Sequence, residues 1–515
     1  MKKLVMFILV SMFYVPILPS FGEPLLIDED YMIRKFVSDL VMPTTIAFVS
    51  NNDILVLQKN DGKVMLVRDG ILQKEPVLDL KVSNNSERGL LGIVAIGSTV
   101  YLYLTESDRD GGTPLGNRIY KFHWNSNSLI EQVLIKDLPV TPGPNHDGGA
   151  MVTGLNGEVF AVIGDLNRKG PLQNFASGSV DDTGVIVQLM PQEKYYAMGI
   201  RNSFGLAVDP VTGNLWDTEN GPDRWDEINL VPDGFNSGWR VIMGPATESD
   251  LEKLPEFQHF VYSNPEFSWE RVVAPTALSF INSEPFKKYQ NSLFVGDCNN
   301  GILYNFSLNE ERNGFVFNNP ILRDSVANEG DSIEELVFGL GFGCITDIDV
   351  GPDGYLYLTS LEHGTIYQIQ PKSLTSKPFT FTLSSSYDGT TYTLSGKTDG
   401  AIPSSFTIIP KQSVRFDIKG NGGDLELTLP KKMLSGIHTV RTNSQEIPFE
   451  EISSNISSTT IRFAVPGDTD SIEIIADFVV PEFGIIALFV FAGAMTTIII
   501  ISRRNQIFIT LLKAN

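Results

Sequence analysis

Positively charged residues are in short supply in this 515-residue chain. It has 39 Lys and Arg against 61 Asp and Glu, which gives a formal net charge of −22. The negative excess is spread along the chain and is not gathered in a tail. This balance argues against nucleic acid as a partner and favours a well-solvated exterior.

Helical periodicity is almost absent as well, so the chain is predicted to be all-β. One unit recurs: a strand, a tight polar turn, and a second apolar strand that ends in a polar residue. Such second strands are predicted at residues 54–58, 100–104, 159–163, 215–219, 293–297 and 355–359. Their spacing of roughly 45 to 80 residues is typical of four-stranded propeller blades with variable loops. We therefore predict a six-bladed β-propeller over about residues 31–370.

The composition changes after the predicted propeller. Ser/Thr-rich alternating strands follow, for example Phe379–Leu383 and Leu425–Leu429. About a hundred residues of this kind predict a small β-sandwich over residues 372–478. We find no chemical motif in it, and a stalk or envelope-packing role is the plain interpretation.

Both ends of the chain resemble membrane-targeting signals. Residues 1–22 combine two lysines with a long apolar stretch and predict a secretory signal peptide. Ile485–Ile501 is almost entirely apolar, and two arginines follow it, which is typical of a transmembrane helix with a cytoplasmic end. Pro481–Gly484 resembles the PEFG type of sorting signal on archaeal surface proteins. We expect residues 481–504 to anchor an exported protein at the extracellular face of the cell membrane or envelope.

Cysteine is scarce, and the only two, Cys298 and Cys344, allow a single disulfide. Export would place them in an oxidising environment. The predicted topology puts Cys298 at the end of a second strand and Cys344 at the start of the next blade, so both lie on one face of adjacent blades. We expect them to be bonded, although two unrelated buried cysteines are the alternative.

One of the five histidines, His146, lies where a loop becomes a strand. Two glycines follow it, and the predicted hairpin of residues 150–163 ends in Asp165, so the open end of the hairpin holds both side chains. A carboxylate beside an imidazole can fix its tautomer and raise its basicity, which a general base needs. The alternative is an ordinary loop histidine with a turn aspartate.

Blade topology brings further polar residues to the same face as His146. Strands in a blade alternate in direction, so first-strand starts and second-strand ends lie together. The residues at these positions include Glu87, Arg201, Asn202, Asp165, Glu219 and Asp297. The mouth of the propeller channel is therefore the predicted site.

Several stretches of the predicted propeller resemble the glucose/sorbosone dehydrogenase family, soluble quinoproteins that use pyrroloquinoline quinone (PQQ) and calcium. The similar stretches, in order, are Glu87–Gly92, His146–Gly149, Gly164–Asp165, Arg201–Ala207, Glu219–Pro222, Asp226–Asn229, Asn236–Trp239 and Gly351–Tyr357. The match is ordered over roughly 330 residues. The resemblance implies an oxidoreductase that acts on a sugar or small polyol, with an electron acceptor that the sequence does not identify.

The resemblance assigns roles at the site. It makes His146 the base that takes the proton from the anomeric hydroxyl while hydride passes to the quinone, and Asp165 the residue that orients it. Arg201 would polarise the quinone carbonyl, which is an electrostatic role. Asn202 and Glu87 would line the cofactor pocket.

The resemblance also implies calcium, a hard ion that binds oxygen ligands. The backbone carbonyls of Gly221 and Pro222 would hold the ion that binds the quinone. Asp226 and Glu227 would hold a second, structural calcium.

Two departures from the family pattern lie near the expected cofactor. Cys344–Asp347 reads Cys-Ile-Thr-Asp where the family has Arg-Ile-Arg-Asp, and Asp297–Asn300 lacks a cation that the family usually offers. PQQ carries three carboxylates, and burying them unpaired costs several kcal/mol. The sequence offers four replacements, Lys59, Arg88, Arg168 and Arg224.

Two other functions stay open at this point. A surface propeller without a cofactor that binds glycans or a partner protein fits the missing cations, and a Cys298–Cys344 bridge would weigh in its favour. A calcium-dependent hydrolase is the third, since six-bladed propellers also host lactonases. It needs several carboxylates around the channel, and Glu87, Asp165 and Asp297 are a partial set.

Overall fold

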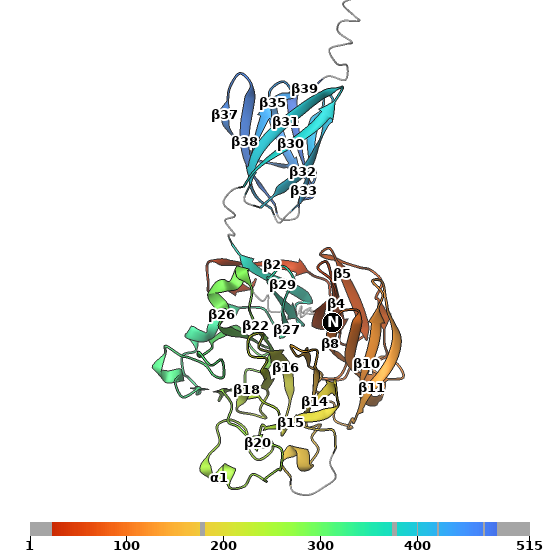
Figure 1. Ribbon diagram of the computed structural model, residues 1–515, viewed down its shortest axis with the longest axis vertical. Helices are drawn as coiled ribbons and strands as arrows, with labels where there is room; N and C mark the ends of the chain where they lie inside the picture. Colours follow the sequence, from red (N-terminus) through yellow and green to blue (C-terminus); the bar gives the residue numbers. More distant parts are fainter. Residues whose placement is uncertain are drawn as a thin grey trace, which may run out of the picture. The chain divides into compact units, whose positions relative to one another are not determined.

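A computed structural model describes residues 23–175, 181–372, 379–398, 400–419, 422–466 and 469–480 (Figure 1). The chain divides into two compact units, Met1–Lys372 and Ser373–Asn515. The predicted signal peptide and the predicted sorting and membrane segment lie outside the described residues. Within the described ranges, no helix is long and apolar enough to cross a membrane.

The all-β prediction is confirmed, because the described part of the first unit folds into six sheets. In order, the first three sheets contain β3 (Pro43–Phe48), β4 (Asp53–Gln58), β5 (Lys63–Arg68), β6 (Ile71–Leu72) and β7 (Leu78–Asp79); then β8 (Leu90–Ile96), β9 (Thr99–Ser107), β10 (Pro114–Trp124) and β11 (Leu129–Leu138); then β12 (Met151–Thr153), β13 (Val159–Ile163), β14 (Val185–Met190), β15 (Lys194–Met198), β19 (Phe235–Asn236) and β20 (Val261–Tyr262).

The other three sheets follow the same plan. They contain β16 (Ser203–Val208), β17 (Leu215–Glu219), β18 (Asp226–Val231), β21 (Phe267–Trp269) and β25 (Val326–Ala327); then β22 (Pro275–Phe280), β23 (Ser292–Asp297), β24 (Leu303–Ser307), β26 (Val337–Leu340) and β1 (Leu25–Leu26); then β27 (Ile345–Val350), β28 (Leu356–Ser360), β29 (Thr365–Pro371) and β2 (Tyr31–Val37). The described helices are short: α1 (Glu248–Leu251) and the 3₁₀ turns Pro171–Gln173, Glu284–Tyr289, Pro320–Leu322 and Glu334–Leu336.

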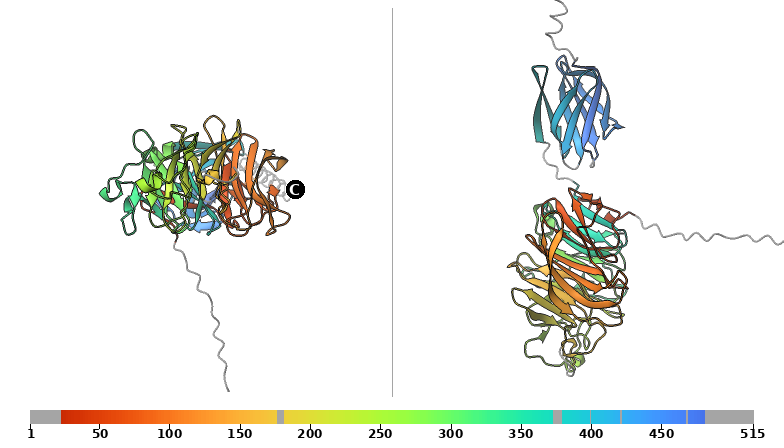
Figure 2. Two further views of the ribbon diagram at one scale, coloured as in Figure 1. Left: turned by 90° about the horizontal axis from the view of Figure 1, so that it is seen from below. Right: turned by 90° about the vertical axis from the view of Figure 1, so that its right-hand side faces the viewer.

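The first strands of the six sheets contact one another in a closed ring. The ring runs from β3 through β8, β12, β16, β22 and β27 and returns to β3. Strand β2, near the N-terminus, pairs with β29 and completes the sixth sheet, so the two ends of the unit close the ring together. The sheets are therefore the blades of a propeller whose six innermost strands surround one axis. Figure 2 shows the sheets from two further sides.

The second strand of each blade is buried along most of its length because it is covered on both faces. In β4, Leu55 and Leu57 pack against the second blade, whereas Ile54 and Val56 pack in a cluster with residues of the sixth. Successive side chains of a strand point to opposite faces, so both sets are buried. This packing explains why the second strands were the clearest signal in the sequence.

The second unit consists of two five-stranded sheets. One contains β30 (Phe379–Tyr387), β31 (Thr390–Thr398), β34 (Gly423–Pro430), β38 (Ser458–Val465) and β37 (Glu450–Ser454); the other contains β32 (Ile402–Ile409), β33 (Ser413–Lys419), β39 (Ser471–Val479), β35 (Leu434–Thr442) and β36 (Gln445–Ile447). Leu425, Leu427 and Leu429 alternate along β34 and are fully buried in the core between the sheets. The unit is a β-sandwich.

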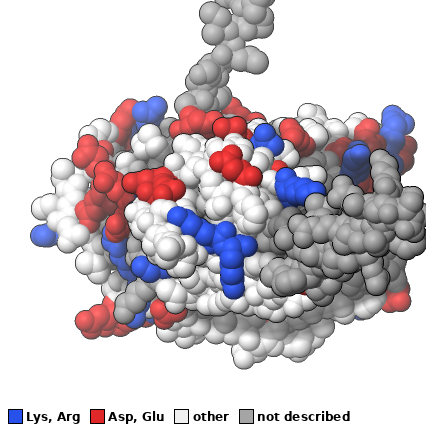
Figure 3. All heavy atoms as spheres, turned by 90° about the horizontal axis from the view of Figure 1, so that it is seen from above, with Lys and Arg blue, Asp and Glu red and all other residues white. Residues whose placement is uncertain are grey.

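Charged side chains are distributed over the surface. On the face drawn in Figure 3, Asp and Glu lie at several separate places, with Lys and Arg between them. On this face the negative charge is therefore dispersed and does not form a single patch.

Candidate functional site

A cavity of about 470 Å³ opens where the inner strands of the propeller begin. Each blade contributes to its wall. The polar and sulfur-bearing side chains of the wall belong to Thr44, Thr45, Lys59, Ser86, Glu87, His146, Met151, Arg201, Asn202, Asn220, Thr276, Cys298, Cys344, Thr346 and Asp347. The volume is in the range of small-molecule sites, and the cavity lies on the face predicted from blade topology.

The hairpin β12–β13 brings His146 and Asp165 together. The Nδ1 atom of His146 lies 2.6 Å from Oδ1 of Asp165. Asp165 also accepts hydrogen bonds from the backbone N–H of Asn167 and from Nε1 of Trp239, at 2.9 and 2.8 Å. Burial alone would raise the pKa of Asp165, but these bonds, that from His146 first, outweigh it and lower the pKa. The ionised carboxylate therefore holds the proton on Nδ1, which leaves Nε2 of His146 as an acceptor.

The two glycines after His146 are needed for the close approach of its loop to the blades. His146 itself has a positive φ of 64°. A Cβ on Gly148 would lie 2.4 Å from the Val162 carbonyl oxygen, and one on Gly149 would lie 2.5 Å from the Leu91 Cβ. Any larger residue would push His146 away from its position at the pocket wall.

Arg88 holds the loop that carries His146 in place through contacts inside the protein. Its Nε donates to the buried carboxylate of Asp147 at 3.3 Å, and its Nη2 donates to the carbonyl oxygens of Thr141 and Gly143. Arg88 is only 3% exposed. It is a structural cation of the loop and does not reach the pocket.

Arg201 forms the cationic part of the wall next to His146. Its Nη1 donates to the Asn220 carbonyl oxygen at 2.6 Å, and its guanidinium lies 5.3 Å from the centre of the Trp239 ring. Burial lowers the pKa of Arg201, although Asp165 and Glu219 oppose this effect. Its Nε is buried without a hydrogen-bond partner among the described residues. A buried, unused donor of this kind is suited to an oxygen atom of a ligand.

Trp239 and Glu219 lie behind the site and support it, and no role was predicted for either residue from the sequence. Trp239 donates to Asp165 and lies under Arg201, so one side chain positions both. Glu219 accepts the backbone N–H of Arg201 at 2.8 Å and the hydroxyl of Ser237 at 2.8 Å, and burial raises its pKa to about 7. Both lie in stretches that resemble the family, which is the signal that could have identified them.

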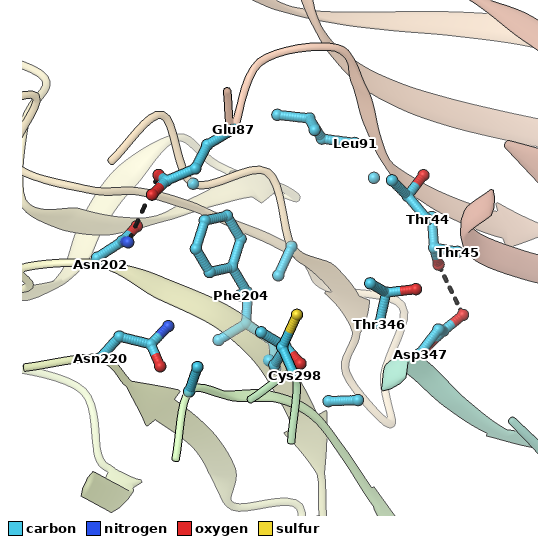
Figure 4. Close-up of a pocket in the computed structure, with 18 of the residues that line it drawn as sticks. Thr44, Thr45, Glu87, Leu91, Asn202, Phe204, Asn220, Cys298, Thr346 and Asp347 are labelled. Atoms are coloured by element: carbon cyan, nitrogen blue, oxygen red, sulfur yellow. Dashed lines mark hydrogen bonds between the residues drawn. The ribbon is translucent and has the colours of Figure 1, made fainter. Parts of the chain in front are cut away.

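Glu87 and Asn202 lie beside each other in the wall (Figure 4). Glu87 accepts the backbone N–H of His146 at 2.5 Å, and Asn202 Nδ2 lies 3.5 Å from the same carboxylate oxygen. Burial raises the pKa of Glu87. The amide oxygens of Asn202 and Asn220 are both buried and without partners among the described residues. This side of the pocket therefore holds several polar atoms that no described side chain uses.

The predicted calcium ligands are dispersed. Gly221 lines the pocket, but Pro222 is exposed and lies outside the lining. The carboxylate of Asp226 accepts the backbone N–H groups of Gly221, Val273 and Ala274 at 2.6 to 2.8 Å. Glu227 follows Asp226 on β18 and so points to the opposite face, where it accepts the N–H of Gly244.

The arrangement of Asp226 and Glu227 therefore gives no support to the predicted calcium between them. The two carboxylates lie on opposite faces of one strand, and each already accepts backbone N–H groups. Across the described residues, no group of three or more His, Cys, Asp or Glu side chains is arranged for a metal.

The fifth and sixth blades form the other side of the pocket. Cys298 and Cys344 are bonded, with Cα atoms 3.7 Å apart, so the predicted disulfide is confirmed. Figure 4 shows Thr346 and Asp347 opposite Asn202 and Asn220. The Asp347 carboxylate accepts the Thr45 hydroxyl at 2.7 Å and the Ile46 N–H at 2.8 Å, and burial raises its pKa to about 6.

The carboxylates expected for a hydrolase do not gather at the channel. Asp297 is fully buried and accepts the N–H groups of Asn300 and Ile302 and the hydroxyl of Tyr304. Asp165 lies behind His146 and is engaged by it. Glu87 alone of the three lines the pocket. This arrangement gives no support to a lactonase-like site.

Comparison with known proteins identifies the propeller. The sequence profile of the family described as glucose/sorbosone dehydrogenase matches residues 40–368. The aldose sugar dehydrogenase YliI of Escherichia coli (strain K12) is 26% identical over 359 residues, which cover 64% of this chain and 90% of that protein. Quinoprotein glucose dehydrogenase B of Acinetobacter calcoaceticus is 25% identical over 264 residues, 43% of this chain and 55% of that protein.

Solved structures share the fold. The soluble aldose sugar dehydrogenase of Escherichia coli in its apo form superimposes with a TM-score of 0.53 at 23% identity, covering 66% of this chain and 100% of that one. The PQQ-bound aldose sugar dehydrogenase of Streptomyces coelicolor gives a TM-score of 0.51 at 19% identity, covering 66% and 98%.

Proposed function

This chain belongs to the glucose/sorbosone dehydrogenase family, and we propose that it oxidises an aldose or related sugar at the anomeric carbon. The observation that carries this proposal is the His146–Asp165 pair beside Arg201 in the wall of one pocket. The pair supplies a base, and Arg201 supplies a positive charge next to it. The relatives named as aldose sugar dehydrogenase and quinoprotein glucose dehydrogenase support the same chemistry.

His146 acts as the general base. Its Nε2 accepts the proton of the anomeric hydroxyl, while Asp165 holds the opposite ring nitrogen protonated and stabilises the imidazolium that forms. Trp239 keeps the Asp165 carboxylate in place during this change, because its Nε1–H donates to the second carboxylate oxygen. The oxidised product is the corresponding lactone.

The pocket fits PQQ at the side of Arg201. The unpartnered Nε–H of Arg201 is a donor for a quinone carbonyl oxygen, and the Asn202 amide lies next to it in the wall. PQQ, when bound, supplies the electron-accepting quinone that takes up the hydride from the anomeric carbon. Arg201 stabilises negative charge at that oxygen because it is preorganised by Asn220 and Trp239.

Calcium is part of this proposal at a single position. Gly221 lines the pocket beside Arg201, and carbonyl oxygens of the kind offered by Gly221 and Pro222 suit a hard ion. A Cβ on Gly221 would lie 2.1 Å from the Arg224 carbonyl oxygen, so this turn requires glycine.

The test uses the purified chain with PQQ and CaCl₂, a panel of aldoses, and an artificial electron acceptor whose reduction is followed by absorbance. We expect reduction that depends on both the sugar and PQQ and that is lost on chelation of calcium. A protein that retains PQQ but oxidises none of the aldoses would contradict the proposed reaction.

A non-catalytic surface propeller that binds glycans or a partner protein is the second candidate. The observation that favours it is the side of the pocket formed by the disulfide, Thr346 and Asp347, which offers no cation to an anionic cofactor. This candidate predicts no PQQ binding, together with glycan or protein binding that survives His146→Ala. Calorimetric titration with PQQ separates the two functions.

We also propose that the protein is exported and anchored at the outer face of the membrane. The apolar residues after Lys3, the apolar run Ile485–Ile501 and the Pro481–Gly484 motif support this location. The Cys298–Cys344 disulfide also supports it, because such bonds persist in oxidising compartments. Fractionation of cells, with protease accessibility of the propeller, checks this proposal.

A further inference from the structure

The pocket wall contains two cationic side chains, Lys59 and Arg201. They come from opposite sides of the propeller, because Lys59 follows β4 in the first blade and Arg201 precedes β16 in the fourth. Arg201 already has a proposed role beside the base His146. Lys59 has no role in the proposed reaction. It is nevertheless buried, with only 8% of its surface exposed.

The position of Lys59 is fixed by its backbone. Its N–H donates to the Met42 carbonyl oxygen at 2.9 Å, and its own carbonyl oxygen accepts the N–H of Leu90 at 3.0 Å. The backbone of Lys59 therefore links the first blade, where β3 and β4 pair, to β8 of the second blade. The side chain leaves this fixed point at the pocket wall.

The ammonium group of Lys59 makes only neutral contacts. Its Nζ lies 3.1 Å from the Asn60 side-chain oxygen and 3.5 Å from the Asn84 carbonyl oxygen, and it forms no ion pair with a carboxylate of the described residues. Lys63, four residues later, is the contrasting case: it is partly exposed and pairs with Asp61 at 3.0 Å. The two neutral oxygens replace only part of the solvation that a buried ammonium group loses, and no anion balances its charge.

Electrostatics agree with this description. Burial lowers the pKa of Lys59 to about 8, and the negative charge of Glu87 opposes the shift. Lys59 therefore stays mostly protonated at pH 7. A carboxylate from a ligand would restore the lost solvation and raise this pKa again.

The other cations near the site are already paired. Arg88 is bound to Asp147 inside the loop, Arg168 pairs with Asp181 at 3.3 Å, and Arg224 pairs with Glu270. None of the three lines the pocket. Lys59 is thus the candidate among the four that faces a ligand.

We propose that Lys59 binds a carboxylate of the small molecule that fills this pocket. The inference rests on the proposed function and deepens it. The carboxylate has two possible sources, the quinone cofactor or an acidic aldose such as a uronic acid. In either case Lys59 replaces the charge that the disulfide side of the pocket lacks.

The test compares Lys59→Met, which keeps the length of the side chain but removes its charge, with Lys59→Arg, which keeps the charge. Lys63→Met is the matched control, since it removes a cation outside the pocket. Circular dichroism and thermal melting establish that each variant folds. If Lys59→Met does not fold, Lys59→Gln takes its place.

In the first arm, PQQ is titrated into each protein with calcium present, and the dissociation constant is measured by fluorescence. If the carboxylate belongs to the cofactor, Lys59→Met should raise Kd by about tenfold or more, because a charge-assisted hydrogen bond is lost. Lys59→Arg should stay within a few-fold of wild type, and Lys63→Met should be unchanged.

In the second arm, KM is measured for glucuronate and glucose at saturating PQQ. If the carboxylate belongs to the substrate, Lys59→Met should raise KM for glucuronate alone by about tenfold and leave PQQ binding unchanged.

Two results overturn the inference: Lys59→Met changes neither the Kd for PQQ nor the preference for glucuronate, or wild type binds neither molecule. A different result would contradict the proposed function but support the role of Lys59. In that case PQQ binding depends on Lys59, but the protein oxidises no sugar.

Discussion

The two sides of the pocket use their polar groups in opposite ways. On the side of the third and fourth blades, Arg201 Nε and the amide oxygens of Asn202 and Asn220 have no partners among the described residues, and the bond of His146 to Asp165 uses Nδ1 and leaves Nε2 available. On the side of the fifth and sixth blades, the two cysteines are bonded to each other, and Asp347 is satisfied by Thr45 and Ile46.

The comparison shows that the groups suited to a reaction and the groups that could balance the charge of a ligand are not on the same side of the pocket. Unpartnered donors and acceptors beside a base are prepared for a reacting molecule, whereas internally satisfied groups only shape the wall. The first side keeps the residues expected of a sugar dehydrogenase. The second has a disulfide where the family pattern predicts cations. Under the proposed function, the base and its neighbouring positive charge are therefore present, and the anionic ligand would need other cationic partners.

The largest effect is expected from His146→Ala on the reactive side. Removing a positioned base should lower kcat by about 10² to 10⁴ and leave the melting temperature nearly unchanged. The control is His123→Ala, because His123 is exposed on β10 outside the pocket. Steady-state kinetics with an artificial acceptor provide the measurement, and a fully active alanine variant would remove His146 from the mechanism.

On the opposite side, Cys298→Ser combined with Cys344→Ser should reduce stability rather than chemistry. The bridge closes a loop with a sequence separation of 46 residues, and the loss of such a constraint costs about 4 kcal/mol in the chain-entropy treatment. Denaturant unfolding of the oxidised wild type and the double variant measures the difference. Equal midpoints would show that the bridge contributes no stability.

A third variant adds a cation to the side of the pocket formed by the fifth and sixth blades. Thr346→Arg restores one arginine of the pattern that the family has at this position, and Thr346 lines the pocket. We expect the Kd for PQQ to fall about tenfold, because one more carboxylate gains a charge-assisted partner. Thr346→Gln, which adds length without charge, is the control. Unchanged affinity for the arginine variant would mean that carboxylates do not lie near this side.

The smallest effect concerns Asp347. Its pKa is raised by burial from 3.8 to about 6 in the folded protein, so the folded state binds the proton more tightly than the unfolded state. Stability from this group is therefore greatest at low pH and is lost as pH rises from about 4 to 6. Asp347→Asn keeps one oxygen for both donors and removes the charge.

The asparagine variant should gain about 2 °C in melting temperature over wild type at pH 7 and nothing at pH 4. Calorimetry at both values measures this difference. A gain that is equal at the two pH values would assign the effect to packing and not to titration.

Local patterns determined the architecture and the reactive pair. Most second strands of the blades carry apolar residues on both faces, as Leu55 and Val56 do in β4, so the sequence predicted these strands without any knowledge of their partners. The hairpin that joins His146 to Asp165 is short, and strand alternation alone placed Cys298 and Cys344 on one face of adjacent blades. These predictions depended on periodicities that neighbouring residues set themselves.

Tertiary structure decided which charged groups are free to meet a ligand. Lys59 and Arg88 were equal candidates in the sequence, but Arg88 is bound by Asp147, which lies 59 residues away, and Lys59 is left without an anion. Trp239 donates a hydrogen bond to Asp165, which lies 74 residues away in the sequence. The carboxylate of Asp226 accepts the backbone N–H groups of Val273 and Ala274. Pairings of this kind arise only when distant blades close into a ring, because a charge is satisfied by whichever partner the packed chain brings within reach.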